Sequence, residues 1–403
     1  MLPAFSRPYE DEVLSSWLTR LAFDNGLNRR MLLTGAGLKL EGKTDFNIDH
    51  LNDIGALDVL SDYANCSSDA IRNASLHYYN NKLFTVKNNG IIPLIWQAKR
   101  PVSIFNDASG QGNLLFCPSC LARRDHPVYY RRKWRLSISF VCLQCKCYLR
   151  EVCPHCSKPS SKMRDVSAMA DYKNCDRYLL ACGTCKGDIS KCIPQTAPEH
   201  IIRMQQQINN YLDQPYSTKE RYSVGYFKVV HGIARMLLKN SLNLRYGPFV
   251  SYVYHQTQTV DYRLDHRNAD LADLTVRQRA DVFRMAMWLL EEWPGRLTKL
   301  CIKYRLNQKS MLSIVPDAPL WYYNAIGDLP DGTSKEDRVP KRWTLSVEDL
   351  QSIEDRRRRW RYDIDVQEEY YDGNTSYIDP LPEYDRTRDL YEMLYVKRYR
   401  SYY

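Results

Sequence analysis

Eight of the 13 cysteines form four Cys-x-x-Cys pairs, and these pairs are the residues best suited to carry chemistry. They are Cys117 with Cys120, Cys142 with Cys145, Cys153 with Cys156, and Cys182 with Cys185. A short knuckle aims two thiolates at one ion, and a second knuckle completes the tetrahedral shell that zinc prefers. The sequence therefore predicts two zinc ions per chain, bound by these eight cysteines. Ligation by adjacent pairs is the simplest arrangement, and interleaved ligation is the alternative.

The identity of one ligand stays open at this point, because Cys147 follows Cys145 closely and either thiol can complete the first shell. His126 and His155 are nearby imidazoles that can also substitute. Two closed shells of four thiolates leave no coordination position for water or substrate, which favours structural zinc over metal-assisted hydrolysis. The cysteines without a partner at ligand spacing are interpreted as small buried hydrophobic residues: Cys66, Cys175, Cys192 and Cys301.

Basic residues exceed acidic ones by 57 to 47, a formal net charge of +10, and part of the excess lies in the cysteine-rich region. Residues 117–159 hold nine Lys or Arg against two acidic residues. A local basic excess indicates an acidic partner such as nucleic acid. Two four-thiolate zinc sites, each with a net negative charge, would reduce this positive charge. We expect these basic residues to form an exposed binding patch. The alternative is that the segment Tyr129–Arg135 is a strand whose alternate aromatic side chains are buried. The candidate binding residues are Arg123, Arg124, Arg131, Arg132, Lys133 and Arg135.

Two further motifs favour structural interpretations. Gly37–Thr44 matches the phosphate-binding pattern G-x-x-x-x-G-K-[ST], but the preceding residues have a helical pattern and no buried strand enters the loop. The run Arg356–Arg361 is better explained as a solvated helix face around Trp360 than as a nucleic-acid contact. Without an open metal site or a suitable phosphate loop, the sequence argues against an enzyme.

The elements that position these residues are mostly helices. Apolar spacing predicts a helix over Glu10–Phe23 closed by Gly26, and a second over Arg29–Leu33, which together resemble a helix-turn-helix. Later helices are predicted over Glu199–Leu212, Gly225–Leu238, Arg277–Trp293 and Gly295–Tyr304, with another starting at Ser346.

The fold expected from these patterns is mainly α and multidomain. It has an N-terminal helix-turn-helix-like domain (1–106), a tandem zinc-ribbon region (107–195) entered through a linker at 106–113, a helical domain (196–323) and a C-terminal helical, Tyr-rich region (324–403). No apolar run reaches the ~18 residues that a membrane span requires, and Met1–Glu10 lacks the order of a signal peptide. We therefore expect a cytoplasmic protein.

Three segments in order resemble the TniQ/TnsD family of transposon target-selection proteins: Pro8–Ala22 (PYEDEVLSSWLTRLA), Phe116–Leu121 (FCPSCL) and Trp288–Arg296 (WLLEEWPGR). The resemblance implies a non-catalytic bacterial, nucleoid-associated protein that marks the insertion site and recruits the AAA+ ATPase TnsC. It also implies an N-terminal helix-turn-helix, tandem zinc ribbons and, when bound to Cascade, a homodimer.

Two functions follow from this resemblance. In relatives the first zinc site commonly ends in Cys-x-x-His, whereas Cys145 stands here, a departure that concerns the geometry of that loop and not the type of metal. The direct DNA readers are usually longer than these 403 residues, with additional C-terminal helix-turn-helix domains. The chain is therefore expected to resemble the branch of CRISPR-associated transposons, in which an RNA-guided Cascade complex with its guide RNA finds the target DNA. The alternative, kept open by the +10 charge, is a TnsD-like sequence-specific DNA reader that recruits TnsC directly.

Overall fold

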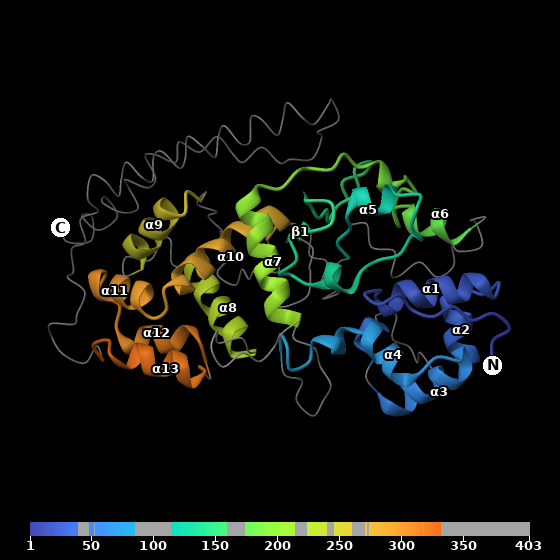
Figure 1. The fold of residues 1–403 in the computed structure, drawn as a ribbon, viewed down its shortest axis with the longest axis horizontal. Coiled ribbons are helices and arrows are strands. Elements are labelled where there is room, and N and C mark those ends of the chain that lie inside the picture. The colour runs from blue at the N-terminus through green and yellow to red at the C-terminus, as the bar shows by residue number, and fades with distance from the viewer. Residues whose placement is uncertain are drawn as a thin grey trace, which may run out of the picture. The chain divides into compact units, whose positions relative to one another are not determined.

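The computed structural model describes residues 1–38, 48–51, 53–84, 114–158, 174–213, 224–239, 246–259, 271, 274–316 and 318–331. All of them belong to one compact unit, Met1–Ile353. The described part is mainly helical, as predicted (Figure 1). The predicted linker, the arginine run, the helix from Ser346 and most of the phosphate-loop match lie outside the described residues. The four domain boundaries stay predictions.

The N-terminal helices α1 (Leu14–Asp24) and α2 (Arg29–Gly35) contact each other across a turn containing Gly26. Trp17 is fully buried on the same face as Leu14 and Leu18, as the apolar spacing predicts. Gly26 has a φ of +64° and its N–H donates to the carbonyl of Phe23, which ends α1.

The predicted start of α1 at Glu10 is wrong, because the chain before Leu14 is extended and pairs with residues 130–132. The N–H of Val13 donates to the carbonyl of Tyr130, and the N–H of Arg132 donates to the carbonyl of Asp11. Glu12 is buried and forms an ion pair with Arg20, and its Oε1 accepts a 2.8 Å hydrogen bond from Ser16 Oγ. Asp11 forms an ion pair with Arg131 of the cysteine-rich region. These carboxylates therefore do not load the first turn of the helix.

Two helices that the sequence pattern did not predict follow, α3 (Ile54–Ala64) and α4 (Ser68–Ala74). Asp53 caps α3 through the backbone N–H of Ala56, and Ser67 caps α4 in the same way. The short 3-10 turns η1 (Ile48–His50) and η2 (Leu76–Tyr79) contact each other, and η1 also contacts α1.

The cysteine-rich region contains short elements. They are α5 (Pro118–Ala122), the 3-10 turn η4 (Arg132–Arg135), strands β1 (Val141–Cys142) and β2 (Cys147–Tyr148), α6 (Cys175–Leu180) and the 3-10 turn η6 (Ile189–Lys191). The two strands form an antiparallel hairpin in which Val141 pairs with Tyr148 and Cys142 with Cys147. The segment Tyr129–Arg135 is therefore not a strand, although Tyr130 and Trp134 are buried.

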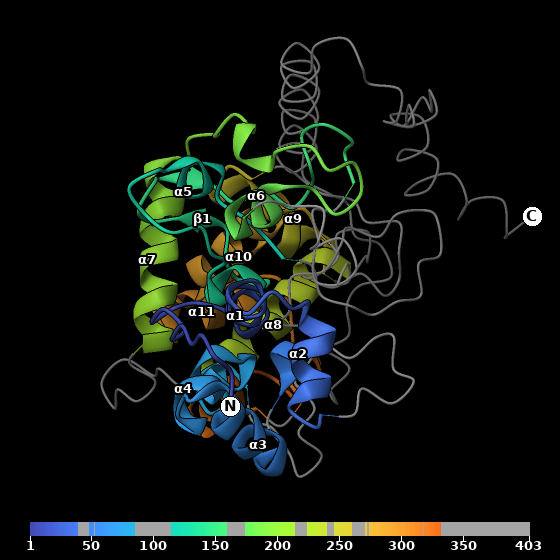
Figure 2. The same cartoon turned by 90° about the vertical axis from the view of Figure 1, so that its right-hand side faces the viewer.

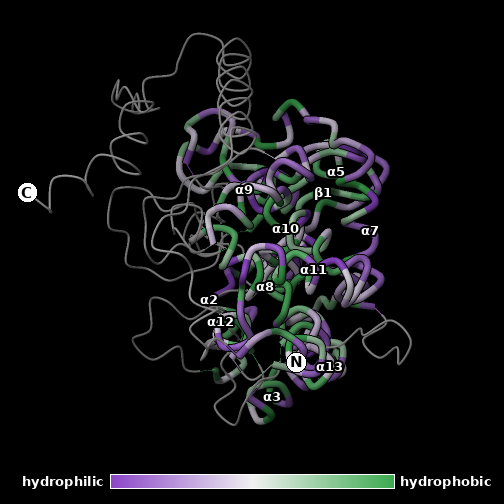
Figure 3. Tube along the Cα trace, turned by 90° about the vertical axis from the view of Figure 1, so that its left-hand side faces the viewer, coloured by the Kyte–Doolittle hydropathy of each residue, from purple (hydrophilic) through white to green (hydrophobic). Residues whose placement is uncertain are grey.

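The remaining described elements are helices that pack on one another. They are α7 (Glu199–Asp213), α8 (Val224–Lys239), α9 (Gly247–Gln256), α10 (Val276–Glu291), α11 (Gly295–Lys303), α12 (Gln308–Ile314) and α13 (Leu320–Gly327). The predictions of α7, α8, α10 and α11 are confirmed within two residues, including the Thr275 and Gln278 capping box. Helices α8 and α10 contact each other extensively (Figure 2), and hydrophobic residues recur along α8 (Figure 3). Among the described residues, no helix is long and apolar enough to cross a membrane.

Candidate metal centres

The structure brings the eight predicted cysteines together in two groups of four. In each group every sulfur lies within 4.8 Å of the other three. Adjacent knuckles pair: Cys117 and Cys120 with Cys142 and Cys145, and Cys153 and Cys156 with Cys182 and Cys185. The adjacent arrangement is therefore the one that the fold presents, and the interleaved alternative is not.

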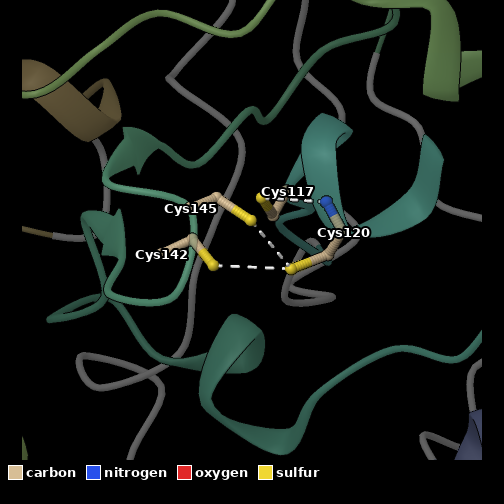
Figure 4. A group of neighbouring side chains, drawn as sticks. All are labelled: Cys117, Cys120, Cys142 and Cys145. Carbon is tan, nitrogen blue, oxygen red and sulfur yellow. Dashed lines mark hydrogen bonds between the residues drawn. The ribbon is translucent and has the colours of Figure 1, made fainter. Parts of the chain in front are cut away.

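Two different elements supply the first group. Cys117 and Cys120 flank the start of α5, whereas Cys142 and Cys145 come from β1 and the hairpin turn that follows it (Figure 4). Cys120 Sγ lies 3.5 Å from Cys142 Sγ and 3.4 Å from Cys145 Sγ. The backbone N–H of Cys120 donates to Cys117 Sγ at 3.4 Å, which stabilises negative charge on that sulfur.

Three of the four knuckles share one backbone conformation. The residue after the second cysteine has a left-handed φ: +54° at Lys146, +54° at Ser157 and +61° at Lys186. Its N–H donates to the carbonyl of the first cysteine, for example from Lys146 to Cys142 at 2.7 Å. This turn brings both cysteine side chains to one side of the chain. No glycine marks these positions, so the sequence motifs alone do not reveal the conformation.

The second group has equally favourable geometry. Cys153 Sγ lies 3.7 Å from Cys185 Sγ, and Cys156 Sγ lies 3.8 Å from Cys182 Sγ. Bonds of ~2.3 Å from a tetrahedral zinc to sulfur place two ligands about 3.8 Å apart. Thiolate groups at this spacing fit a metal ion of zinc type, and either group can hold one.

Gly187 lies so close to the second group that only a residue without a side chain fits there. A Cβ at this position would lie 2.5 Å from His155 Cδ2 and 3.3 Å from Cys185 Sγ, so a larger residue would displace the knuckle. The His155 ring nitrogen Nε2 contacts the backbone oxygen of Asp188 at 3.0 Å. His155 and His126 belong to neither sulfur group.

The unpaired cysteines divide between core positions and one position beside the first group. Cys66, Cys192 and Cys301 are buried and Cys175 is partly buried, and burial raises the pKa of Cys301 to about 12. Cys147 is also buried, and its sulfur lies 3.5 Å from Cys117 Sγ, outside the group of four. The knuckle turn thus selects Cys145 as the fourth member of the group.

The expectation of an exposed patch is wrong for two of the candidate basic residues. Arg132 is buried, donates to the backbone oxygen of Asn73 and stacks on Tyr78 with 3.8 Å from Cζ to the ring centroid. Arg135 is 1% exposed and its Nε lies 3.2 Å from Asp49 Oδ2.

The other four candidates remain nearer the solvent. Arg131 is partly buried in its ion pair with Asp11, and Lys133 lies 3.5 Å from Asp213. Arg123 pairs with Asp125 at 3.0 Å, and Arg124 is exposed. Arg124 is therefore the one exposed residue among these six candidates, and binding by any of the six stays a prediction.

The fold and its sulfur groups define a mainly helical protein built around two potential metal centres. Residues 3–149 match the sequence model of the TniQ family, so this part of the chain is similar to a TniQ domain. The matched segment runs from the N-terminal helices through the complete first cysteine group. A role in selecting targets for transposition follows from this domain at the level of the family. None of the curated proteins matches the chain.

Proposed function

We propose that the chain is a non-catalytic adaptor that selects target sites for a CRISPR-associated transposon. It links an RNA-guided Cascade complex, with its guide RNA, to the AAA+ regulator TnsC. The match of residues 3–149 to the TniQ family carries the proposal. In this role the two cysteine groups each bind a zinc ion, giving two per chain.

The chemistry of the sulfur groups supports a structural role for the metal. Four thiolates fill the tetrahedral shell of zinc and leave no position for water or substrate. The cysteine-rich region that holds the first group is also hydrogen-bonded to the chain just before α1, since the N–H of Val13 donates to the carbonyl of Tyr130 at 2.9 Å. Zinc would thus fix the cysteine-rich region against the N-terminal helices and would act as a rigid cross-link.

Reconstitution tests the adaptor function directly. The purified chain, Cascade with guide RNA, and TnsC are mixed in pairs and together, and complexes are separated by size-exclusion chromatography. We expect the chain to elute with Cascade and to be required for TnsC to join it. Failure of the chain to bind either partner would contradict the proposal.

A matched pair of charge reversals tests the accessible basic residues. Arg123→Glu with Arg124→Glu changes charge beside α5, and Lys299→Glu with Lys309→Glu changes exposed lysines on α11 and α12. We expect the first pair to weaken association with the nucleic-acid-containing complex by at least about tenfold, and the second to have little effect. Equal effects would show that net charge, rather than this surface, matters.

The second candidate function is a direct reader of target DNA, favoured by the net charge of +10 and by the exposure of Arg124, Lys146 and Lys191. A salt titration of duplex binding separates the two functions. A direct reader binds one sequence far more tightly than random DNA at every salt concentration, whereas an adaptor with a basic surface loses all binding together as salt rises.

A further inference from the structure

A fifth thiol accompanies the first cysteine group. Cys147 Sγ lies 3.5 Å from Cys117 Sγ, the same separation as between Cys120 Sγ and Cys142 Sγ within the group. Cys147 is 2% exposed and Cys117 is fully buried. The sulfur of Cys147 therefore stands at a ligand-like distance from a predicted ligand, in a place shielded from solvent.

The register of the hairpin explains this position. Cys142 in β1 pairs directly with Cys147 in β2. Directly paired residues of antiparallel strands project from the same face, with Cβ atoms ~5 Å apart. Because Cys142 belongs to the group, Cys147 is presented on the side of the hairpin where the ion would lie.

Cys145 and Cys147 flank the left-handed residue Lys146 and differ in access to solvent. Cys145 is partly exposed and Lys146 is exposed, whereas Cys147 is buried. The thiolate of Cys145 is thus more accessible to electrophiles and oxidants than the thiol of Cys147.

We propose that Cys147 is a reserve ligand of the first metal site, which takes the fourth position when the Cys145 thiolate is lost. While Cys145 is bound, the Cys147 thiol donates its S–H to the Cys117 sulfur. On replacement, Cys147 releases its proton to solvent and its sulfur bonds to the ion, so the charge of the four-thiolate site is unchanged. The inference rests on metal binding by the first group and is independent of target selection.

Substitution of cobalt(II) for zinc tests the proposal, because sulfur-to-cobalt charge-transfer absorption reports the number of bound thiolates. The full chain is compared with Cys145→Ser, Cys147→Ser, Cys120→Ser and the double variant Cys145→Ser with Cys147→Ser. Cys120 is the matched control, since it is also partly exposed and belongs to the same group.

We expect Cys145→Ser and Cys147→Ser each to retain the full absorption of the wild type. Cys120→Ser and the double variant should lose the contribution of one thiolate among the eight in the two groups. Loss in Cys145→Ser equal to that in Cys120→Ser would overturn the proposal. Loss in Cys147→Ser alone would also overturn it, by making Cys147 an ordinary ligand.

A second measurement avoids any failure of Cys145→Ser to fold. The folded zinc protein is treated with limiting iodoacetamide, and singly modified protein is mapped by peptide mass spectrometry. Protein alkylated at Cys145 should still carry two zinc ions by native mass spectrometry, and protein alkylated at Cys120 should carry one. Loss of one zinc ion from protein alkylated at Cys145, equal to the loss after alkylation at Cys120, would overturn the reserve ligand.

Discussion

Lys146 shows how a single backbone conformation builds a knuckle. Its φ of +54° lies in the left-handed region, which costs a residue with a side chain roughly 1–2 kcal/mol, yet its N–H closes the turn onto Cys142. The turn is retained because it aims Cys142 and Cys145 at a common point. A β-branched residue tolerates this conformation worst.

Lys146→Val should therefore weaken the first site. We expect about a tenfold loss of zinc affinity there, corresponding to ~1.4 kcal/mol, measured by competition with a chromophoric chelator. Lys146→Gly should bind zinc at least as tightly as the wild type. The control is Lys158→Val, at an exposed lysine that is not among the residues with positive φ. An equal loss of zinc affinity in Lys158→Val would show that the lost charge, and not the backbone conformation, is the cause.

At the scale of elements, a buried ion pair joins η1 to η4. Arg135 is 1% exposed and Asp49 is fully buried, and Asp49 Oδ1 also accepts a hydrogen bond from the Ser15 N–H at 2.8 Å. This pair connects the cysteine-rich region to the N-terminal helices through the protein interior.

Asp49→Asn keeps the shape of the side chain but removes the charge that compensates Arg135. We expect it to lower the free energy of unfolding by ~3–5 kcal/mol, measured by urea denaturation of the zinc-loaded protein. Asp125→Asn, at the exposed pair with Arg123, should change the free energy of unfolding far less, because water screens that pair. If both variants lose the same small amount, the buried pair does not hold these elements together.

The sequence predicted those features that local spacing encodes, and it did not predict those that depend on residues distant in the chain. Helices such as α10 repeat apolar residues at helical spacing, and the four knuckles carry their ligands at fixed spacing, so a short window contains the information. The environment of Arg131 and Arg135 depends on Asp11 and Asp49, which are distant in sequence. A run of basic residues therefore resembles a solvated surface until its tertiary partners are known.

At the scale of the molecule, the first cysteine group lies between two sets of helices. On one side the N–H of Tyr130 donates to Ser16 Oγ of α1 at 3.0 Å. On the other, Gln205 of α7 accepts from the N–H of Phe140 at 2.7 Å, and its Nε2 donates to the carbonyl of Ile138 at 3.3 Å. Buried residues form a continuous core through all three regions.

Removal of metal should therefore loosen both sets of helices together. Without the ion, the thiolates of the first group repel one another and the hairpin loses its cross-link, so its contacts with α1 and α7 weaken. Hydrogen-deuterium exchange of the chelated protein should show faster exchange in α1 and α7 as well as in 117–148.

Helices α12 and α13 provide an internal reference, because they pack on each other and Tyr322 donates to the carbonyl of Met311. Their exchange should change least. Gln205→Ala is the matched variant: with zinc retained, it should accelerate exchange in α7 while leaving α1 protected. Faster exchange confined to 117–148 after chelation would mean that the metal orders its own hairpin without supporting either neighbour. The joint response of α1 and α7 is thus the observation that distinguishes a cross-link for the whole unit from a local one.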